Sequence, residues 1–347
     1  MKKLIITVLS ILTFSIFAHA PIEHDPIVSS LELYEVRELI QSYRQTGNDA
    51  YLETAWNLMQ TELPTNASAK SLLTYAILSQ SRHQFDVARK FVVRALALDA
   101  SNNEAWLLLA SIHLVVGRIE PARNACGHLK NASILITVTC FARIALADGK
   151  AEVAYPKLAK LLMSAAAQYF GATTLDIRAW AESVAGDLSS ASHLPKQAID
   201  HYRRSLTHLD QVQVKAALAD VLLADRQAPM VVDLIDHHEA ALPLKIRRLI
   251  ALKTLSRSHE TEEDTTNLNE AFTRWIELED WLHAREMCRF YLDVLPQPDL
   301  AKKLAIHNIK MQKELEDVRL LQRTRCRTSA CKGALIARGL PSVSDQF

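Results

Sequence analysis

The chain has 347 residues, of which 49% are hydrophobic, and its formal net charge is +1. This length fits two ordinary domains or one solenoid without a sharp internal boundary, and the hydrophobic content supports a sizeable core. The near-neutral charge lacks the basic excess that is the electrostatic footprint of nucleic-acid binding. The chain has only 8 Gly and 11 Pro, which favours helices because both residues destabilise helix interiors. Alternating β-branched runs with hairpin turns are absent, so an all-α fold is predicted.

Residues 1–20, MKKLIITVLSILTFSIFAHA, have the layout of a secretory signal peptide. Two lysines precede an uncharged apolar run of about 15 residues, which is short for a membrane span of roughly 20 residues. Removing this segment takes away two lysines and no acid, so the formal charge falls from +1 to −1. We predict export across the inner membrane into a periplasm, with no membrane span in the mature chain. Because Pro21 would hinder cleavage, an uncleaved N-terminal anchor is the alternative.

The next segment, residues 21–67, reads as a short leader followed by a degenerate helix pair. Ser29 and Glu32 form a capping box that opens a helix, and Gly47 ends it. Residues 50–61 are predicted to form the partner helix.

Two better-defined helix–turn–helix units follow, at residues 68–101 and 102–134. Ala88 and Ala122 lie 34 residues apart, and each lies near the start of the second helix of its unit. Two antiparallel helices joined by a short turn approach closely only where small side chains meet at the crossing. The spacing therefore predicts a repeat rather than two unrelated hairpins.

The residues at matching positions of the two units resemble the tetratricopeptide repeat (TPR) family. The matching positions are Leu72, Tyr75, Ala76, Ala88 and Ala95 in the first unit and Trp106, Leu109, Ala110, Gly117, Ala122 and Leu129 in the second. The usual Tyr of the repeat is replaced by Ser79 or His113, and the closing Pro by Ala100 or Ile134. The resemblance implies a right-handed superhelix of antiparallel helix pairs.

Further helix pairs are predicted along the chain, about six to seven in all. Residues 68–167 match the repeat best, and 168–296 are more degenerate. The predicted packing residues at helix crossings and turns are Ala76, Ala88, Ala95, Trp106, Ala110, Gly117, Ala122, Ala154, Ala198 and Ala284. Within the degenerate part, residues 242–258 are predicted to be helical, and the acidic stretch 259–267 is predicted to be a loop.

The C-terminal segment is predicted to cap the open end of the solenoid. One long helix over 299–322, in the segment 297–323, carries a charged run that suits a solvated capping helix. Residues 324–347 carry Gly, Pro and Ser and are predicted to be a loose tail.

The chain has five cysteines, which matter because export would place them in an oxidising compartment. Cys126 and Cys140 fall on helices predicted to be neighbours, so a disulfide is reasonable, and two buried free thiols are the alternative. Cys326 and Cys331 could close a small loop in the tail. Cys288 occupies a core position of its repeat. The spacing of the cysteines is not that of a zinc site, and no metal site is predicted.

Two pairs of histidines are candidate metal ligands. His237 and His238 stand between Asp236 and Glu239, but neighbouring residues on a helix point about 100° apart, so a solvated helix end is the preferred interpretation. His201 and His208 are also interpreted as solvated. The chain lacks the short motifs of metalloproteases, serine hydrolases, P-loop proteins and dinucleotide-binding enzymes. No enzymatic activity and no cofactor are therefore predicted.

A partner-binding groove is the remaining candidate site. In TPR arrays the first helices of successive pairs line the concave face, where partners usually dock. Carried over to this chain, the lining is Lys70, Leu73, Ile77, Gln80, Glu104, Leu107, Ser111, Leu114, Thr139 and Arg143. Its mixed, largely apolar character fits an amphipathic helix or an extended apolar segment of a protein. The alternative is that Leu107 and Leu114 pack against the protein's own helices.

The resulting prediction is a non-catalytic periplasmic scaffold or adaptor that binds a protein segment, with a role in envelope-complex assembly or regulation. A metal- or redox-handling accessory protein using His237, His238, Cys326 and Cys331 is the alternative. TPR arrays also occur in polysaccharide secretion, although no residue of this chain favours that role.

Overall fold

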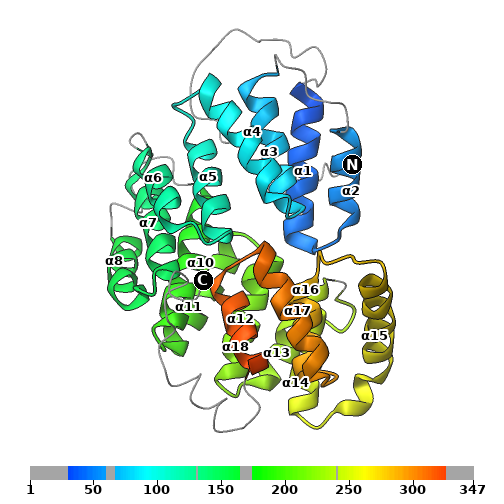
Figure 1. Cartoon of the computed structure of the whole chain (residues 1–347). Coiled ribbons are helices and arrows are strands. Elements are labelled where there is room, and N and C mark those ends of the chain that lie inside the picture. The colour runs from blue at the N-terminus through cyan, green and yellow to red at the C-terminus, as the bar shows by residue number, and fades with distance from the viewer. Residues whose placement is uncertain (1–29, 60–66, 130–131, 165–173, 240, 326–347) are drawn as a thin grey trace, which may run out of the picture.

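The computed structural model describes residues 30–59, 67–129, 132–164, 174–239 and 241–325. Over these residues the chain forms 17 α-helices and no β-strand (Figure 1). The signal-like segment 1–20 and the tail from residue 326 onward lie outside the described residues. The N-terminal and middle helices are α1 (Ser30–Thr46), α2 (Ala50–Leu58), α3 (Ala69–Ser81), α4 (Phe85–Leu98), α5 (Asn103–Val115), α6 (Ile119–Gly127), α7 (Ile134–Ala147), α8 (Ala151–Met163), α10 (Leu175–Ala191) and α11 (Pro195–His208). The remaining helices are α12 (Val212–Ala224), α13 (Ala228–Leu234), α14 (Leu242–Thr254), the 3₁₀ helix η1 (Ser258–Glu260), α15 (Glu262–Glu277), α16 (Ala284–Asp293), α17 (Pro298–Met311) and α18 (Leu315–Arg325).

Consecutive helices pack against each other as antiparallel pairs, most extensively α10 with α11, α3 with α4, α16 with α17, α5 with α6 and α1 with α2 (Figure 1). The fold is thus an all-α, TPR-like superhelix, which confirms the predicted fold class. None of the helices in the described part of the chain is long and apolar enough to cross a membrane.

The turns within these pairs share one backbone feature. A residue with positive φ stands early in each turn: Gly47, His83, Gly117, Gly149, His193, Arg226, Ser256 and Glu279. From the turn at His83 onward, each of these residues is the second one after the end of the preceding helix, and in every turn but that of Glu279 it is the middle one of three between two helices. Glycine enters this left-handed region without a steric penalty, whereas other residues pay roughly 1–2 kcal/mol, so five turns tolerate that strain. The common turn is independent support for a structural repeat.

The starts of three first helices are capped in the same way. The side chains of Ser68, Asn102 and Ser133 each accept a hydrogen bond from the backbone N–H three residues further on, at 3.0–3.4 Å. Such caps satisfy N–H groups that have no partner inside the helix and stabilise it by about 1 kcal/mol. The small residues at the crossings are buried: Ala76, Ala88, Ala110, Ala122, Ala198 and Ala284 are at most 2% exposed.

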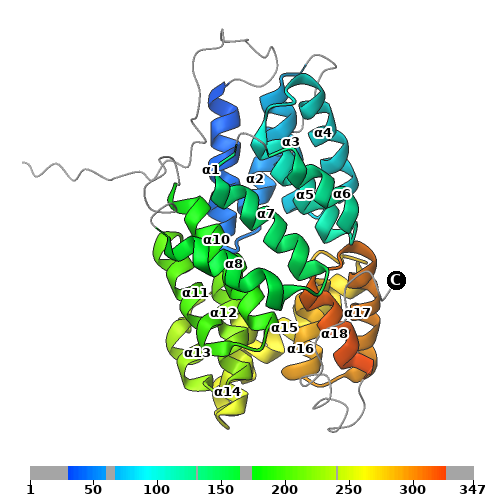
Figure 2. The ribbon, with the colours of Figure 1, turned by 90° about the vertical axis from the view of Figure 1, so that its left-hand side faces the viewer.

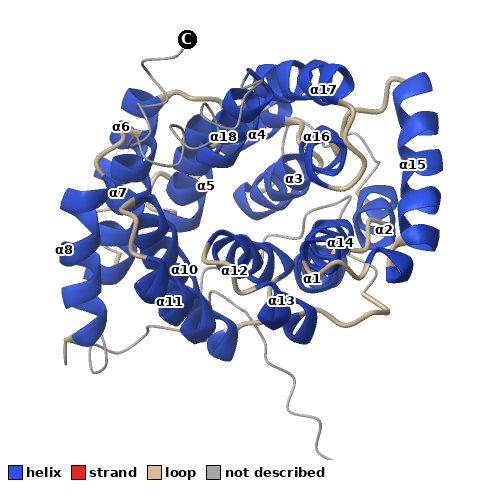
Figure 3. Cartoon of the chain, turned by 90° about the horizontal axis from the view of Figure 1, so that it is seen from below, coloured by secondary structure: helices blue, strands red, loops and turns tan. Residues whose placement is uncertain are grey.

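The superhelix turns back on itself, as the ring of helices in Figure 3 shows. At Gly47, in the α1–α2 turn, an added Cβ would lie 2.8 Å from Ala241 Cβ, and α1 contacts α12. His283 Nε2 lies 3.1 Å from Asp49 Oδ2, across 234 positions of sequence. The sequence predicted a superhelix with an accessible concave face, whereas in the structure the N-terminal helix pair contacts the C-terminal half of the chain.

Two C-terminal elements differ from the sequence prediction. The stretch 259–267 was predicted as a loop, but it contains most of η1 and the start of α15. Three acidic residues in the first turn of α15 stabilise it, because they interact favourably with the positive end of the helix dipole. The single helix predicted over 299–322 is broken into α17 and α18. At the break, Lys313 N–H donates to Val115 O instead of continuing the helix, and the Asp317 carboxylate accepts from Glu314 N–H. Because Asp317 is 1% exposed, this cap is a buried one and α18 is not a solvated helix.

Gly186 provides a test of the packing between α10 and α11. A Cβ at this position would lie 2.5 Å from Cε1 of Tyr202, whose ring is fixed because its hydroxyl donates to Asp187. We therefore expect Gly186→Ala to lower the free energy of unfolding by about 2 kcal/mol. Gly127→Ala is the matched control: its added Cβ meets nothing within 4 Å, so stability should stay constant or rise by up to about 1 kcal/mol. Equal urea midpoints for the two variants would contradict this packing.

Candidate protein-binding inner face

The first helices α1, α3, α5 and α7 carry two groups of polar side chains, one held together by Arg37 and the other by Arg143. We call these five residues, Arg37, Thr74, Glu104, Ser111 and Arg143, the inner face; Thr74 is itself buried and the other four are partly exposed. Arg37 Nε donates to Thr74 Oγ1 at 3.0 Å, and its Nη1 donates to both carboxylate oxygens of Glu104 at 2.9 and 3.1 Å. One guanidinium on α1 therefore ties together three consecutive first helices.

The second half of the inner face reaches the C-terminal helices. Arg143 Nη1 donates to Ser111 Oγ at 3.2 Å, and its Nη2 lies 3.9 Å from Glu314 Oε1 in the α17–α18 turn. Figure 2 shows α17 and α18 below α6 and α7. In the C-terminal half of the chain, Arg247 of α14 plays a part similar to that of Arg37. It donates to Asp220 of α12 and to Glu286 of α16.

The structure divides the predicted groove lining into three groups. Leu73, Ile77, Leu114 and Thr139 are buried, at 8% exposure or less, and so are covered by the protein itself. Gln80, Glu104, Leu107, Ser111 and Arg143 are partly exposed, and Lys70 is exposed. Leu107 packs partly against the core, as the self-packing alternative proposed. The residues that remain accessible are mainly polar, so the expected apolar lining is mostly unavailable.

Sequence reasoning missed Arg37 and Arg44 on α1, which was not counted among the groove helices. The signal was present, because two residues seven apart on a helix share a face. Arg44 is exposed. Thr74 was also missed, because its neighbour Leu73 matched the groove position of the family.

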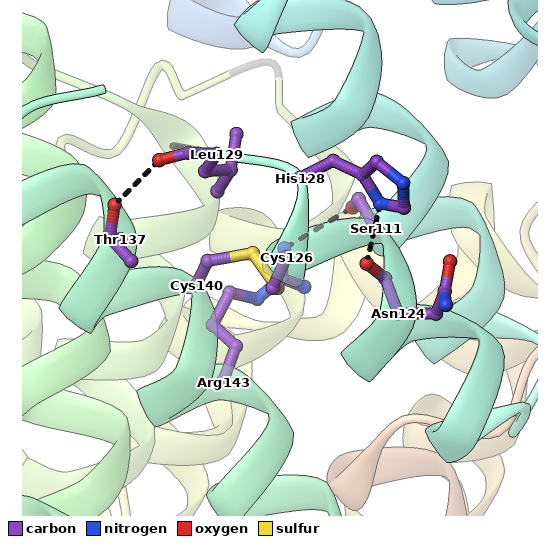
Figure 4. The surroundings of a disulfide bond; sticks show 8 residues. All are labelled: Ser111, Asn124, Cys126, His128, Leu129, Thr137, Cys140 and Arg143. Carbon is purple, nitrogen blue, oxygen red and sulfur yellow. Dashed lines mark hydrogen bonds between the residues drawn. A yellow bond between two sulfur atoms is a disulfide. The ribbon is translucent and has the colours of Figure 1, made fainter. Parts of the chain in front are cut away.

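The Cys126 and Cys140 side chains join the second helix of one repeat to the first helix of the next (Figure 4). Their Cα atoms are 5.9 Å apart and their sulfurs are at bonding distance. The pair anchors α7, the helix that carries Arg143. Cys288 is buried, and burial raises the pKa of its thiol to about 12, which suits a core residue. Cys326 and Cys331 lie outside the described residues.

The histidines occupy two different environments. His201 was predicted to be solvated but is 5% exposed: its Nδ1 donates to Glu182 Oε2 at 2.6 Å. This pair links α10 to α11, so the histidine packs between helices. His237 and His238 are exposed in the segment after α13, with ring centroids 3.7 Å apart. No group of three or more His, Cys, Asp or Glu side chains in the described ranges is arranged to hold a metal ion.

Two cavities lie away from the inner face. One of about 560 Å³ has a mainly apolar wall formed by α11, α12 and α13, including Leu206, Leu222 and Met230. The other, of about 270 Å³, lies between the segment after α13, α14 and α15 and is lined by charges of both signs. No inner-face residue lines either cavity.

Asp187 makes stability depend on pH. Burial raises its pKa to about 6, against the Tyr202 hydrogen bond and the charge of Arg143, which lower it. A raised carboxyl pKa stabilises the fold below the unfolded value near 4, and this contribution is lost as pH rises through about 6. Asp187→Asn should therefore be more stable than the native chain at pH 7.5, by roughly 2 kcal/mol, and equal to it at pH 4. Urea unfolding at both pH values tests this, and a difference that is independent of pH would contradict it.

The repeated pairs, the common turn and the row of first helices define the class: a TPR-like helical-repeat solenoid. No protein-family model matches the chain, and no curated protein matches it. Among solved structures it is similar to a chain of the "APC/C hetero-tetramer Cut9-Hcn1" crystal structure, with 14% identity and a TM-score of 0.43. The match covers 86% of this chain and 50% of that chain, so it spans half the length of the solved protein. The fold is therefore assigned from the repeated helix pairs and their common turn, and not from this similarity.

Proposed function

We propose that this chain is a non-catalytic exported scaffold that binds a segment of a protein partner on its inner face. The observation that supports this most directly is the position of Arg37, which fixes Thr74 and Glu104 on successive first helices. Polar groups held by rigid helices can bind a peptide with little loss of side-chain entropy on binding. TPR-like folds are typically non-enzymatic interaction scaffolds, which agrees with this role.

The compartment is part of the same proposal. Residues 1–20 have the pattern of a signal peptide, which supports export to a periplasm and a role in assembly or regulation of an envelope complex. The close approach of Cys126 and Cys140 is in keeping with an oxidising compartment, where such pairs persist as disulfides.

Photo-crosslinking in intact cells tests the binding surface. A photoreactive amino acid is placed at Arg44 or at Lys70, which are exposed, so the fold should be preserved. Matched control positions are Arg203 on α11 and Lys157 on α8, both exposed and away from the inner face. We expect a defined protein adduct from the first two positions and none from the controls. Adducts of equal yield at all four positions, or none at all, would sink the proposal.

A further inference from the structure

The α17–α18 turn already occupies one end of the inner face. Its residue Lys313 donates a backbone hydrogen bond to Val115 O at 2.7 Å. Val115 is the last residue of α5, and the final carbonyls of a helix have no partner within that helix. Gln312, just before Lys313, is extended, with φ −138° and ψ 144°. An extended backbone therefore docks on the end of a first helix, as a bound peptide would.

The same turn places a carboxylate among cations of both halves of the ring. Glu314 Oε2 accepts from Arg285 Nη2 at 2.8 Å, and Oε1 faces Arg143 at 3.9 Å. His83, Asp187 and Asp317 are further titratable neighbours of this carboxylate. Burial alone would raise the pKa of Glu314, but Arg285 and Arg143 outweigh burial and lower it. The side chain is thus an anion held at the basic end of the inner face.

The two sides of this contact are unequal. Within the C-terminal helices the turn is firmly held, because the Asp317 carboxylate accepts from Arg285 Nε and Asn308 Nδ2 as well as from Glu314 N–H. Its contacts toward the inner face include the Lys313–Val115 hydrogen bond and an ion pair of 3.9 Å whose side chains are 29% and 38% exposed. Long, partly exposed ion pairs contribute little to stability. Moving the turn away from the inner face would break these two contacts and leave the Asp317 contacts that shape the turn intact.

We propose that the α17–α18 turn is the protein's own occupant of the inner face, and that an acidic segment of the partner protein binds there in its place. A carboxylate of the partner would take the position of Glu314 beside Arg143, and a backbone N–H would donate to Val115 O. This inference rests on the proposed scaffold function and names the chemical class of its partner. While the turn occupies the inner face, the partner can bind only to the fraction of molecules whose turn has moved away. The apparent affinity for the partner is lowered by that fraction.

A peptide probe tests the displacement in the full chain. The probe is a fluorescein-labelled copy of residues 311–318, MQKELEDV, and its binding is followed by fluorescence anisotropy. In Glu314→Gln the internal carboxylate is neutral while the Asp317 contacts remain, so we expect the probe to bind about 5–10-fold more tightly than to the native chain. A probe with glutamine in place of its first glutamate should lose this gain.

The role of Arg143 is tested in the same background. Adding Arg143→Ala to Glu314→Gln should abolish the gain in affinity, whereas adding Arg203→Ala, an exposed arginine of α11, should leave it unchanged. Hydrogen exchange gives a second readout: probe binding to the native chain should speed exchange in the peptide containing Lys313. If circular dichroism shows that Glu314→Gln is unfolded, Glu314→Asp replaces it with the same expectation, because its shorter side chain cannot reach Arg143.

Two results would overturn the inference: equal probe affinity for the native chain and Glu314→Gln, or a gain that survives Arg143→Ala. Failure of the proposed function looks different. In that case no protein is crosslinked at Arg44 or Lys70 in cells, with or without Glu314→Gln, even where the peptide probe behaves as expected. A crosslinked partner whose yield does not respond to Glu314→Gln would keep the scaffold function and refute the displaceable turn.

Discussion

Replacing Cys126 and Cys140 together with serine is expected to lower the free energy of unfolding by about 3 kcal/mol. The two residues are separated by 14 positions, and closing a loop of that size stabilises a protein by roughly this amount on the chain-entropy model. Urea unfolding followed by circular dichroism measures the change. Dithiothreitol should shift the midpoint of the native chain to that of the double variant and leave the double variant unchanged.

The same experiment separates the disulfide from its alternative. If the two thiols were free and buried, dithiothreitol would have no effect, and the two serine substitutions would each weaken the core independently. With a disulfide, Cys126→Ser alone should cost about as much as the double variant, because either change opens the loop. Hydrogen exchange should then rise chiefly in α7, since this link holds α6 to α7.

The largest effect of a single substitution is expected at Arg247. Its side chain is 5% exposed and its guanidinium pairs with Asp220 at 3.0 Å and with Glu286 at 2.7 Å. Removing one member of a buried ion pair leaves an uncompensated charge, which typically costs 3–5 kcal/mol. We therefore expect Arg247→Met to lower the free energy of unfolding by about 4 kcal/mol at pH 7, measured by urea or thermal unfolding.

A second substitution identifies the cause of that loss. Asp220 keeps a partner in Arg247→Met, because Arg289 Nη2 also donates to it at 2.6 Å. Glu286 loses the guanidinium that donates to it and keeps only the more distant charge of Arg289, so adding Glu286→Gln should recover part of the lost stability. A double variant that is less stable than Arg247→Met would show that packing of the arginine stem, rather than its charge, holds α12, α14 and α16 together.

The helix pairs were predictable because their signal is local and periodic. Alanines 34 residues apart and glycines at the turns each depend on a few neighbouring residues, and the structure places helix pairs there. The capping box at Ser29 lies outside the described residues. Other turns carry His83, His193 and Glu279 in the same left-handed conformation, so glycine alone does not mark every turn.

Closure of the ring was not predictable, because it depends on single contacts between distant positions. The contacts of Asp49 with His283 and of Val115 with Lys313 each join single positions far apart in the sequence, and such contacts leave no periodic signal. The break between α17 and α18 has the same origin. Its sequence, KMQKELEDVR, suits a continuous helix, and the break is stabilised by the buried Asp317 and by a hydrogen bond to another repeat. The same holds for the candidate site: Ser111 and Arg143 were identified, but the ion pair of Arg143 with Glu314 was not.

The contact between Asp49 and His283 also fixes the number of helix pairs in the ring. An open repeat array can gain or lose a unit with little consequence elsewhere, because each unit touches only its neighbours. Here an inserted unit would widen the circle and pull the first pair away from the α15–α16 segment. Natural variants of this architecture should therefore differ in loops and tails while keeping the same number of helix pairs.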